Sequence, residues 1–395
     1  MRFLTAGESH GPALVGIIEG IPAGLAINED FINEQLSRRQ GGYGRGGRMS
    51  IEKDRIKFLS GIRFGLTTGS PLALLIENKD WPNWEKVMSQ QPRDRTHERS
   101  ITTPRPGHAD LAGGIKYQHE DLRNVLERAS ARETAIRVAI GALSSLLLGH
   151  FAIYTTSFVI AIGGIKASRK FSKGLSTAEI KKKRGSMLYC LDGKAENLMV
   201  EEIDRAKNEG DTLGGVFEIH VEGLPSGLGS HVHWDRRLDN ILAGALMSIP
   251  AIKGVEVGLG FEAAARRGSK AHDELLLNEK GKICRTSNHA GGLEGGISNG
   301  ETIVLRAAMK PIPTLVKSLS SVDLQTRSLN PAAVERSDTC AVPAASVVGE
   351  AVVSWEIAKA FLQKFSGDSL SEVEEAYWNY QNNVREYLGE NNVEN

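Results

Sequence analysis

The chain has 395 residues, with 48 Lys or Arg against 48 Asp or Glu, so its formal net charge is zero. Hydrophobic residues at 41% and charged residues at 24% are ordinary globular values, which excludes wholesale disorder. A neutral chain is not generally coated with polyanion, although charge can still gather locally. Glycine is the outlier: 43 residues are about 11% of the chain, against a usual ~7%.

The first residues and the cysteines indicate a cellular compartment. The start, MRFLTAGESHG, has a charge and glycines where a signal peptide needs an apolar stretch. Cys190, Cys284 and Cys340 are far apart and odd in number, so neither a disulfide scaffold nor a cysteine-rich zinc site is expected. These features predict a cytoplasmic protein.

Gly7–Gly11 matches G-x-S-x-G, the nucleophile turn of α/β-hydrolases. That turn needs a sheet before it and a helix after it. Ser9 has only eight residues before it, and a strand-like run, ALVGIIEG, follows. The context therefore argues against a hydrolase.

The segment 36–63 holds eight Lys or Arg and two acids, and its arginines Arg39, Arg45 and Arg48 lie among glycines. Arginine forks bind phosphate or carboxylate, and glycine lets the backbone approach a ligand. The segment can clamp a small polyanion. Two alternatives stay open at this point: an RNA-binding module built on GRGGRM, and a solvated loop.

Further along, a polar, turn-rich insertion is predicted at 79–103, and Arg105–Asp110 places a histidine beside an arginine and an aspartate in a turn. Arg128–Thr134 opens a helix, with Ser130 at the N-cap and Glu133 at the spacing of a capping box. A helix N-terminus near arginines favours phosphate binding.

Residues 138–165 contain no Asp, Glu, Lys or Arg, which raises the question of a membrane span. Gly149 and His150 interrupt the run. The pattern before them is helical and the pattern after them is β-rich, so a buried helix followed by a buried strand is predicted instead.

The second half begins with a polar insertion predicted at 166–212 and ends with an acidic, Asn-rich segment, 366–395, predicted as a peripheral helix and tail. Gly258-Leu259-Gly260 follows a strand-like run and is the feature that would suit a nicotinamide-dependent oxidoreductase, but no long amphipathic helix follows. His231 and His233 have no evident third ligand, so no metal site is predicted.

Three short phrases recur in the same order. EGIPAGL and EGLPSGL each follow a strand-like run, GIRFG (61–65) and GISNG (296–300) each precede one, and Glu-Arg-Ala (127–129) and Glu-Arg-Ser (335–337) each open a helix-like segment. This order predicts an internal duplication with a pseudo-twofold relation. Taken with the arginine blocks and two turn-borne histidines, His10 and His108, the residues indicate a phosphate-handling enzyme.

Six blocks in fixed order resemble the chorismate synthase family over essentially the whole chain: GESHG, RRQGGYGRGGRM, RPGHAD, RASARET, SNHAGG with GGISNG, and RSDTCAVPAA. The 79–103 insertion resembles the longer form found in many Gram-positive bacteria. The chain departs from the common pattern at Ala129, where serine is frequent, and at Pro250-Ala251, where Asn-Ala is frequent.

The resemblance implies a lyase that converts 5-enolpyruvylshikimate 3-phosphate to chorismate and phosphate, the last common step of the shikimate pathway to aromatic amino acids. This 1,4-anti elimination has no net redox change and yet requires reduced FMN. The two carboxylates and the phosphate of the substrate account for the arginines. A dry, positively lined pocket would stabilise the departing phosphate.

The resemblance also implies roles for single residues. His10 would protonate the flavin or hold its N1 region, His108 would act as general acid at the departing phosphate, and Asp338 would take part in proton removal near flavin N5. Ser9 and Ser130 would support the hydrogen-bond network. Arg39, Arg45, Arg48 and Arg132 would bind substrate or NADP. The implied FMN contacts are Arg128, Ala129, Ser130, Pro250, Ala251, Gly295, Lys310, Pro311, Ile312, Pro313, Thr314 and Arg336.

The fold expected from the resemblance is α+β: a β-α-β sandwich with helices layered between two antiparallel sheets, in a single domain over 1–395. The family assembles as a homotetramer, and no nucleic acid or membrane partner is expected. NADPH is a possible reductant. Since no appended reductase domain is visible, an external flavin reductase is predicted.

Overall fold

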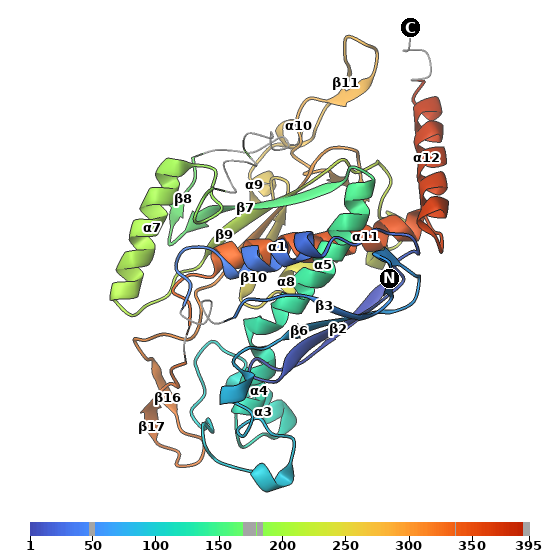
Figure 1. Cartoon of the computed structure of the whole chain (residues 1–395). Coiled ribbons are helices and arrows are strands. Elements are labelled where there is room, and N and C mark those ends of the chain that lie inside the picture. The colour runs from blue at the N-terminus through green and yellow to red at the C-terminus, as the bar shows by residue number, and fades with distance from the viewer. Residues whose placement is uncertain (47–51, 169–178, 180–184, 336, 390–395) are drawn as a thin grey trace.

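The computed structural model describes residues 1–46, 52–168, 179, 185–335 and 337–389 (Figure 1). It combines helices with antiparallel sheets, which confirms the α+β class at this level. The helices are α1 (Glu29–Gln40), α3 (Asp110–Tyr117), α4 (Arg123–Ala129), α5 (Thr134–His150), α7 (Gly193–Asn208), α8 (Leu238–Met247), α9 (Phe261–Ala264), α10 (Gly268–Ala271), α11 (Val342–Lys364) and α12 (Leu370–Tyr387).

The N-terminal half forms a four-stranded antiparallel sheet in the order β1 (Arg2–Ala6), β2 (Ala13–Glu19), β6 (Leu72–Glu77), β3 (Lys57–Ser60). Strand β2 alternates as a sheet with one buried face requires: Leu14 and Ile18 are buried, whereas Ile17 and Glu19 are exposed. The buried face therefore carries the aliphatic residues toward the helices.

The C-terminal half forms a five-stranded antiparallel sheet in the order β10 (Ile252–Val257), β15 (Ile303–Met309), β9 (Gly215–Glu222), β7 (Tyr154–Ile162), β8 (Ile165–Lys166). The uncharged run 138–165 contributes the end of α5 and then β7, so the predicted helix and strand are confirmed. Among the described residues, no helix is long and apolar enough to cross a membrane.

Four two-stranded hairpins complete the strands. They are β4 (Ile62–Arg63) with β5 (Leu66–Thr67), β11 (Leu275–Leu277) with β12 (Ile283–Arg285), β13 (Leu293–Glu294) with β14 (Ile297–Ser298), and β16 (Ser320–Val322) with β17 (Leu329–Pro331). The β11–β12 and β16–β17 hairpins project from the body at opposite ends of the view in Figure 1.

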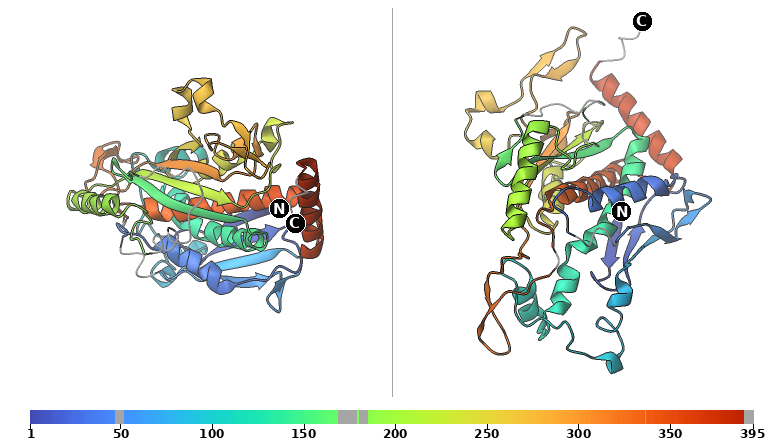
Figure 2. Two further views of the ribbon diagram at one scale, coloured as in Figure 1. Left: turned by 90° about the horizontal axis from the view of Figure 1, so that it is seen from above. Right: turned by 60° about the vertical axis from the view of Figure 1, so that its left-hand side comes forward.

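The left view of Figure 2 shows α5 and α11 between the blue strands of the four-stranded sheet and the green-to-orange strands of the five-stranded sheet. Helix α1 packs on α5 and α11, and α8 packs on α11 and β10. Helix α5 packs on β2, and α11 packs on β7 and β9. The two central helices, α5 and α11, are in close contact at Gly141. A Cβ added to Gly141 on α5 would lie only 2.4 Å from the Ala351 oxygen on α11. Gly349 similarly lets α11 approach the Phe217 ring. Small residues thus set the spacing of the layers.

The turn after β2 is closed by one hydroxyl. Thr67 Oγ1 donates to the Pro22 carbonyl at 2.6 Å and accepts from the Leu25 N–H at 2.9 Å. Thr67 is buried, and its backbone also pairs with that of Leu25. The EGIPAGL phrase is therefore locked to the β4–β5 hairpin.

The turn after β9 has the same arrangement. Ser298 Oγ donates to the Pro225 carbonyl at 2.7 Å and accepts from the Leu228 N–H at 2.9 Å. Hydrogen bonds of Ser298 thus connect the EGLPSGL phrase to the β13–β14 hairpin, just as those of Thr67 connect EGIPAGL to the β4–β5 hairpin.

These bonds bear on one of the three predicted matches. Thr67 in GLTTG (65–69) makes the bonds that Ser298 makes in GISNG (296–300), whereas the predicted match to GISNG was GIRFG (61–65). GIRFG and GLTTG share Gly65 and so lie four residues apart in the sequence. GIRFG was the predicted match because it begins with Gly-Ile, as GISNG does.

Three remaining segments lie outside these layers. Residues 79–103 contain two single-turn 3-10 helices, Trp81–Asn83 and Pro92–Asp94. Helix α7 lies within the second polar stretch, 166–212, and α12 stands at the edge of the molecule (Figure 1). The Ser369 side chain and Glu372 form a capping box at the start of α12.

Candidate active site

A cleft of about 1310 Å³ opens where the helix ends and loops of both halves meet. Fifteen of the predicted site residues line it, although they come from segments far apart in the sequence. They are Ser9, His10, Arg39, Arg45, Ala129, Ser130, Arg132, His108, Pro250, Ala251, Lys310, Ile312, Pro313, Thr314 and Asp338.

His10 is held by Glu127 at the end of α4. The His10 N–H donates to Glu127 Oε2 at 2.8 Å, and ring atom Nδ1 lies 2.9 Å from Oε1. The neighbouring Ser9 N–H donates to the Glu127 carbonyl at 2.9 Å. Burial opposes ionisation of Glu127, but the hydrogen bonds from His10 and the charge of Arg123 hold its pKa below the usual value. Glu127 therefore fixes both the backbone and the ring of His10.

Ser130 joins this network from the start of the next helical segment. Its hydroxyl donates to Ser9 Oγ at 3.1 Å and accepts from the Arg132 N–H at 3.2 Å, which confirms its predicted N-cap role. The cap is on a 3-10 turn, Ala131–Glu133, and α5 begins after it. Glu133, predicted to complete a capping box, instead pairs with Arg137 at 3.5 Å.

His108 sits in a compact ion cluster at the start of α3. Its Nδ1 lies 2.6 Å from Asp110 Oδ1, and Arg105 Nε donates to Asp110 Oδ2 at 2.8 Å. Burial opposes ionisation of Asp110, but the hydrogen bonds from His108 and Arg105 hold its pKa well below its usual range. Arg105 also donates to Thr314 Oγ1 at 2.8 Å, which ties the turn to the 310–314 segment.

Lys310 closes the same side of the cleft. Its ammonium donates to the Gly107 carbonyl, and its backbone N–H donates to the Ala251 carbonyl at 2.9 Å. Burial lowers the pKa of Lys310, and the charge of Lys253 acts in the same direction. Ala251 has φ 69°, a left-handed conformation that favours residues such as Gly or Asn. The backbone of Ala251, rather than its side chain, thus makes the contact.

Two arginines share one buried carboxylate deeper in the cleft. Arg132 Nη1 lies 2.6 Å from Asp54 Oδ1, and Arg39 Nη1 lies 3.5 Å from Asp54 Oδ2. Burial lowers the pKa of Arg39 to about 10, with Arg132 and Arg45 acting in the same direction and Asp54 against it. Arg132 Nη2 is buried and has no hydrogen-bond partner among the described residues, and it lies 3.7 Å from Glu52 Oε2. Such crowding of positive charge suits an anionic ligand.

Asp338, which precedes α11, is held by the glycine-rich segment. Arg45 Nη1 lies 2.8 Å from Asp338 Oδ2, and the Gly46 N–H donates to Oδ1 at 2.6 Å. A carboxylate has about four lone-pair positions, so both oxygens keep accepting capacity. The arrangement anchors the group at the cleft wall.

Three of the predicted residues that the structure describes do not line the cleft. Arg128 points to the first strand, donating to the Gly7 carbonyl at 3.1 Å. Gly295 forms the turn between β13 and β14 with φ 60°, and Pro311 is exposed. Arg48 and Arg336 lie outside the described residues.

The sequence reasoning assigned no role to Trp84, Arg99 and Arg123, which line the cleft, or to Asp54, Asp110 and Glu127, which hold side chains that line it. Asp110 stood in the block that was singled out, but no role was assigned to it. Glu127 was noted only as part of a repeat, and its 117-residue separation from His10 hides the contact. For Trp84 no signal was present in the sequence pattern.

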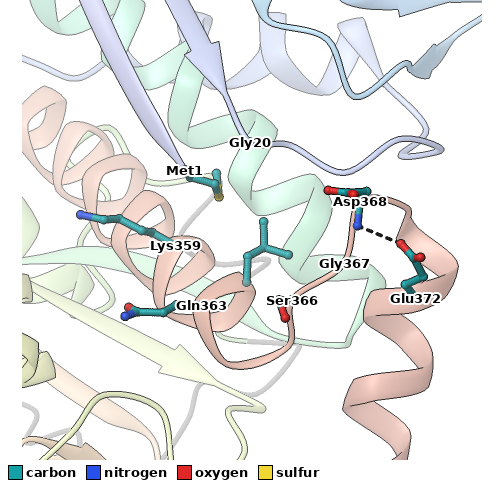
Figure 3. A pocket seen from close by; sticks show the side chains of 9 residues that line it. Met1, Gly20, Lys359, Gln363, Ser366, Gly367, Asp368 and Glu372 are labelled. Carbon is teal, nitrogen blue, oxygen red and sulfur yellow. Dashed lines mark hydrogen bonds between the residues drawn. The ribbon is translucent and has the colours of Figure 1, made fainter.

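A second depression, of about 840 Å³, lies between the N-terminus, the end of α11 and the start of α12. Figure 3 shows Lys359 and Gln363 on α11 near Met1, with Glu372 accepting from the Asp368 N–H at 2.8 Å. Glu372 also caps α12, so its carboxylate is already engaged in hydrogen bonds to the protein's own backbone. The depression contains none of the predicted site residues.

Comparisons with known proteins agree on one family. A family model described as chorismate synthase matches residues 1–362. The chorismate synthase of Desulforamulus reducens is 58% identical over 387 residues, covering 98% of this chain and 100% of that protein. That of Desulforudis audaxviator is 56% identical over 386 residues, covering 98% of each. A solved structure described as a crystal structure of chorismate synthase superposes with a TM-score of 0.79 at 44% identity, over 98% of both chains.

Proposed function

The chain belongs to the chorismate synthase family and is a lyase of aromatic amino acid biosynthesis, and we propose that the large cleft is where it converts 5-enolpyruvylshikimate 3-phosphate to chorismate and phosphate. The observation that carries this proposal is the convergence of His10, His108 and Asp338, each held by a charged partner, on one arginine-lined cleft.

The cleft suits a small molecule bearing several negative charges. Arg39, Arg45, Arg105, Arg132 and Lys310 all line it. Several basic groups in one cleft match a ligand that carries carboxylates and a phosphate. We assign Arg39 and Arg45 to substrate rather than to NADP, because both line the cleft proposed for the substrate. Arg48 remains a proposed member of this set.

The residues present also fit a reduced flavin beside the substrate. A cleft of about 1310 Å³ exceeds the ~300–1,000 Å³ of a typical single-ligand site. Apolar residues, among them Ile249, Ile312 and Val348, offer a surface for a flat ring. Ser130, Pro250, Ala251 and the 310–314 segment are the proposed contacts. Reduced FMN would supply electron density as the C–O bond breaks and receive it back as the C6 hydrogen leaves.

His108 is the proposed general acid. With Nδ1 held by Asp110, the imidazole has Nε2 as the atom that can exchange a proton with a departing phosphate. Asp110 and Arg105 fix the plane of the ring, so the proton is delivered along one direction. Lys310 would stabilise the negative charge that develops on the leaving oxygen.

His10 and Asp338 are the proposed groups on the flavin side. Glu127 holds His10 through Nδ1, which leaves Nε2 to hold or protonate the N1 region. Asp338 keeps lone-pair capacity beside Arg45 and would take part in removal of the C6 proton. Ser9 and Ser130 maintain the position of His10 through their mutual hydrogen bond.

The remaining assignments are extensions of the same proposal. We expect a cytoplasmic homotetramer whose flavin is reduced by an external reductase, with NADPH as the electron source. Arg128, Gly295, Pro311 and Arg336 stay proposed flavin contacts; those that do not line this cleft could act only after rearrangement or beside a neighbouring subunit.

A single β-α-β sandwich domain over 1–395, with insertions at 79–103 and 166–212 and a peripheral segment at 366–395, is likewise proposed. In support of an internal duplication, the order β1-β2-β6-β3 parallels β7-β9-β15-β10, and the Thr67 and Ser298 bonds correspond. Superposition of 10–135 on 215–345 tests this: strands β2 and β9 must coincide.

One anaerobic assay tests the function. The protein is incubated with the enolpyruvyl phosphate substrate, FMN and dithionite, and chorismate absorbance and phosphate release are followed. We expect equal amounts of both products, and none when dithionite is omitted. Absence of product with reduced flavin present would end the proposal. Turnover of a nicotinamide without flavin would favour the oxidoreductase alternative, and steeply salt-dependent RNA binding would favour the RNA-binding alternative.

A further inference from the structure

The indole of Trp84 lies flat on the imidazole of His10, with the ring centroids 3.7 Å apart and the planes inclined by 21°. Trp84 belongs to the polar 79–103 segment and is 7% exposed. We propose that Trp84 is a positioning residue that fixes the plane of the His10 ring, and that 79–103 thereby forms a wall of the active site. This inference rests on the proposed function.

Glu127 alone does not fix the orientation of the imidazole. Its carboxylate contacts the ring edge at Nδ1, 2.9 Å away, and a ring held at one edge can still pivot about that contact. Trp84 covers a face of the ring and blocks this pivot. Glu127 restrains the edge of the imidazole and Trp84 restrains its face. Together the two contacts fix the direction in which Nε2 points. Among the described residues Nε2 has no hydrogen-bond partner, and His10 lines the cleft.

Trp84 is itself held from several sides. Its indole Nε1 donates to Asp80 Oδ2 at 3.0 Å, which anchors the ring within its own segment. The guanidinium carbons of Arg99 and Arg123 lie 4.2 and 5.1 Å from the ring centroid. Such cation–π contacts attract the guanidinium groups to the ring and hold it in place. The indole is therefore a fixed support and not a mobile surface group.

The backbone ties the far end of the segment to the same place. Arg99 has φ 59°, a left-handed conformation that is uncommon for arginine. Its carbonyl accepts a hydrogen bond from Arg123 Nε, and Arg123 also pairs with Glu127 at 3.1 Å. Arg123 thus connects the support of His10 with the end of the 79–103 segment. A surface insertion with no role in the site would not need this connection.

The expected consequence is on rate more than on substrate binding. The arginines proposed for substrate are on other elements, so loss of the indole leaves them in place. A misplacement of about 1 Å at a reacting group can cost ~10²-fold in rate. We expect Trp84→Ala to lower kcat at least about tenfold, with KM for the substrate changed less than about threefold.

The kinetic test uses three variants of the full-length protein with reduced FMN under anaerobic conditions. Trp84→Phe keeps a planar face and should retain most of the activity lost in Trp84→Ala. Trp81→Ala, a half-buried tryptophan in the same segment, should retain wild-type kcat. Wild-type kcat in Trp84→Ala would overturn the proposal. So would equal losses in Trp84→Ala and Trp84→Phe, or equal losses in Trp84→Ala and Trp81→Ala.

A second arm needs no turnover and so separates this inference from the proposed function. A stacked imidazole alters the emission of an excited indole. His10→Ala should therefore change tryptophan fluorescence in the wild-type background and leave it unchanged in the Trp84→Phe background. Equal changes in both backgrounds would contradict the stack. A protein that shows the expected fluorescence but forms no chorismate would retain the stack and lose the proposed function.

Discussion

Glu127 and His10 are joined twice: the His10 N–H donates to Glu127 Oε2 at 2.8 Å, and Nδ1 of the ring lies 2.9 Å from Oε1. One carboxylate thus sets the backbone and the side chain of a residue 117 positions away. The side chain of Glu127 is 1% exposed, so water does not compete for it. The contact places the end of α4 beneath the loop between β1 and β2.

We expect Glu127→Gln to lower kcat about 10- to 100-fold, because the amide can no longer serve as a charged acceptor for both groups. Steady-state kinetics with reduced FMN measures this. Glu374→Gln is the matched control, since Glu374 also pairs with a histidine, His150, but at the half-exposed edge of the molecule. An unchanged kcat in Glu127→Gln would show that the contact does not support catalysis.

His10→Ala and His108→Ala test the two assigned histidines directly. Removing a group that transfers a proton typically costs ~10²–10⁴-fold in rate, so each variant should lose at least about tenfold. Flavin binding, followed by absorbance under anaerobic conditions, should change more for His10→Ala than for His108→Ala. A variant with the wild-type rate would refute the role given to its histidine.

Asp110→Asn should lower the free energy of unfolding at neutral pH. It should also make that free energy depend less on pH in the acid range. The folded-state pKa of Asp110 lies below its usual value, so folding favours the ionised form. Its contribution is fully present above the unfolded pKa of about 3.9 and is lost as pH falls through the folded pKa. Removing a partner from a buried pair typically costs about 3–5 kcal/mol.

Denaturant unfolding at neutral pH and below about pH 4 measures both effects. Wild type and Asp110→Asn should differ most at neutral pH and converge in acid. Asp235→Asn is the control, because His233 and Asp235 repeat the same spacing at 2.6 Å on the exposed surface. A constant difference across pH would contradict the assignment to Asp110.

Asp54→Ala should also destabilise the protein strongly. It removes the carboxylate that Arg132 and Arg39 share and leaves Arg132 with Glu52 alone, 3.7 Å away; loss of one partner from a buried ion pair typically costs about 3–5 kcal/mol. The midpoint of urea unfolding at neutral pH measures this. Asp30→Ala, in the exposed first turn of α1, should leave the midpoint nearly unchanged. Equal midpoints in the two variants would argue against the shared buried carboxylate.

Gly141→Ala tests the packing of the central helices. The added Cβ would lie 2.4 Å from the Ala351 oxygen and must push α5 and α11 apart, at a cost of typically ~1–3 kcal/mol. Gly244→Ala on α8 is the control, since among the described residues nothing beyond its own stretch of helix lies within 4 Å of the new Cβ. That variant should gain about 0.5–1 kcal/mol from helix propensity. Thermal unfolding compares them, and a stabilised Gly141→Ala would contradict the close approach.

Local pattern was sufficient where the deciding interactions are close in sequence. The break at Gly149-His150 ends α5 and permits β7, because the apolar run changes from helical to alternating character there. Ser130 was predicted as a cap from its own neighbours and caps the Ala131–Glu133 turn. The six ordered motif blocks also pointed to the family, because each block is a short run of consecutive residues that can be recognised without knowing the fold.

Sequence comparison was misleading where two segments of similar sequence occupy different positions in the fold. GIRFG resembles GISNG, yet Thr67 in GLTTG makes the bonds that Ser298 makes. Only the hydrogen-bond partners distinguish the two alignments. In the same way, Trp84 stood in a segment that reads as a polar insertion, and nothing local indicates that it meets His10.

The sequence by itself pointed to the α+β class, the family and fifteen residues of the cleft, because its ordered motif blocks resemble a known family and each block is a local property of the chain. It also showed that zero net charge sums a basic segment, 36–63, and an acidic end, 366–395. Only the tertiary structure decided which charges meet. Asp54, Asp110 and Glu127 neutralise and orient the arginines and histidines of the cleft, and these pairings arise when the layers pack segments distant in sequence against one another.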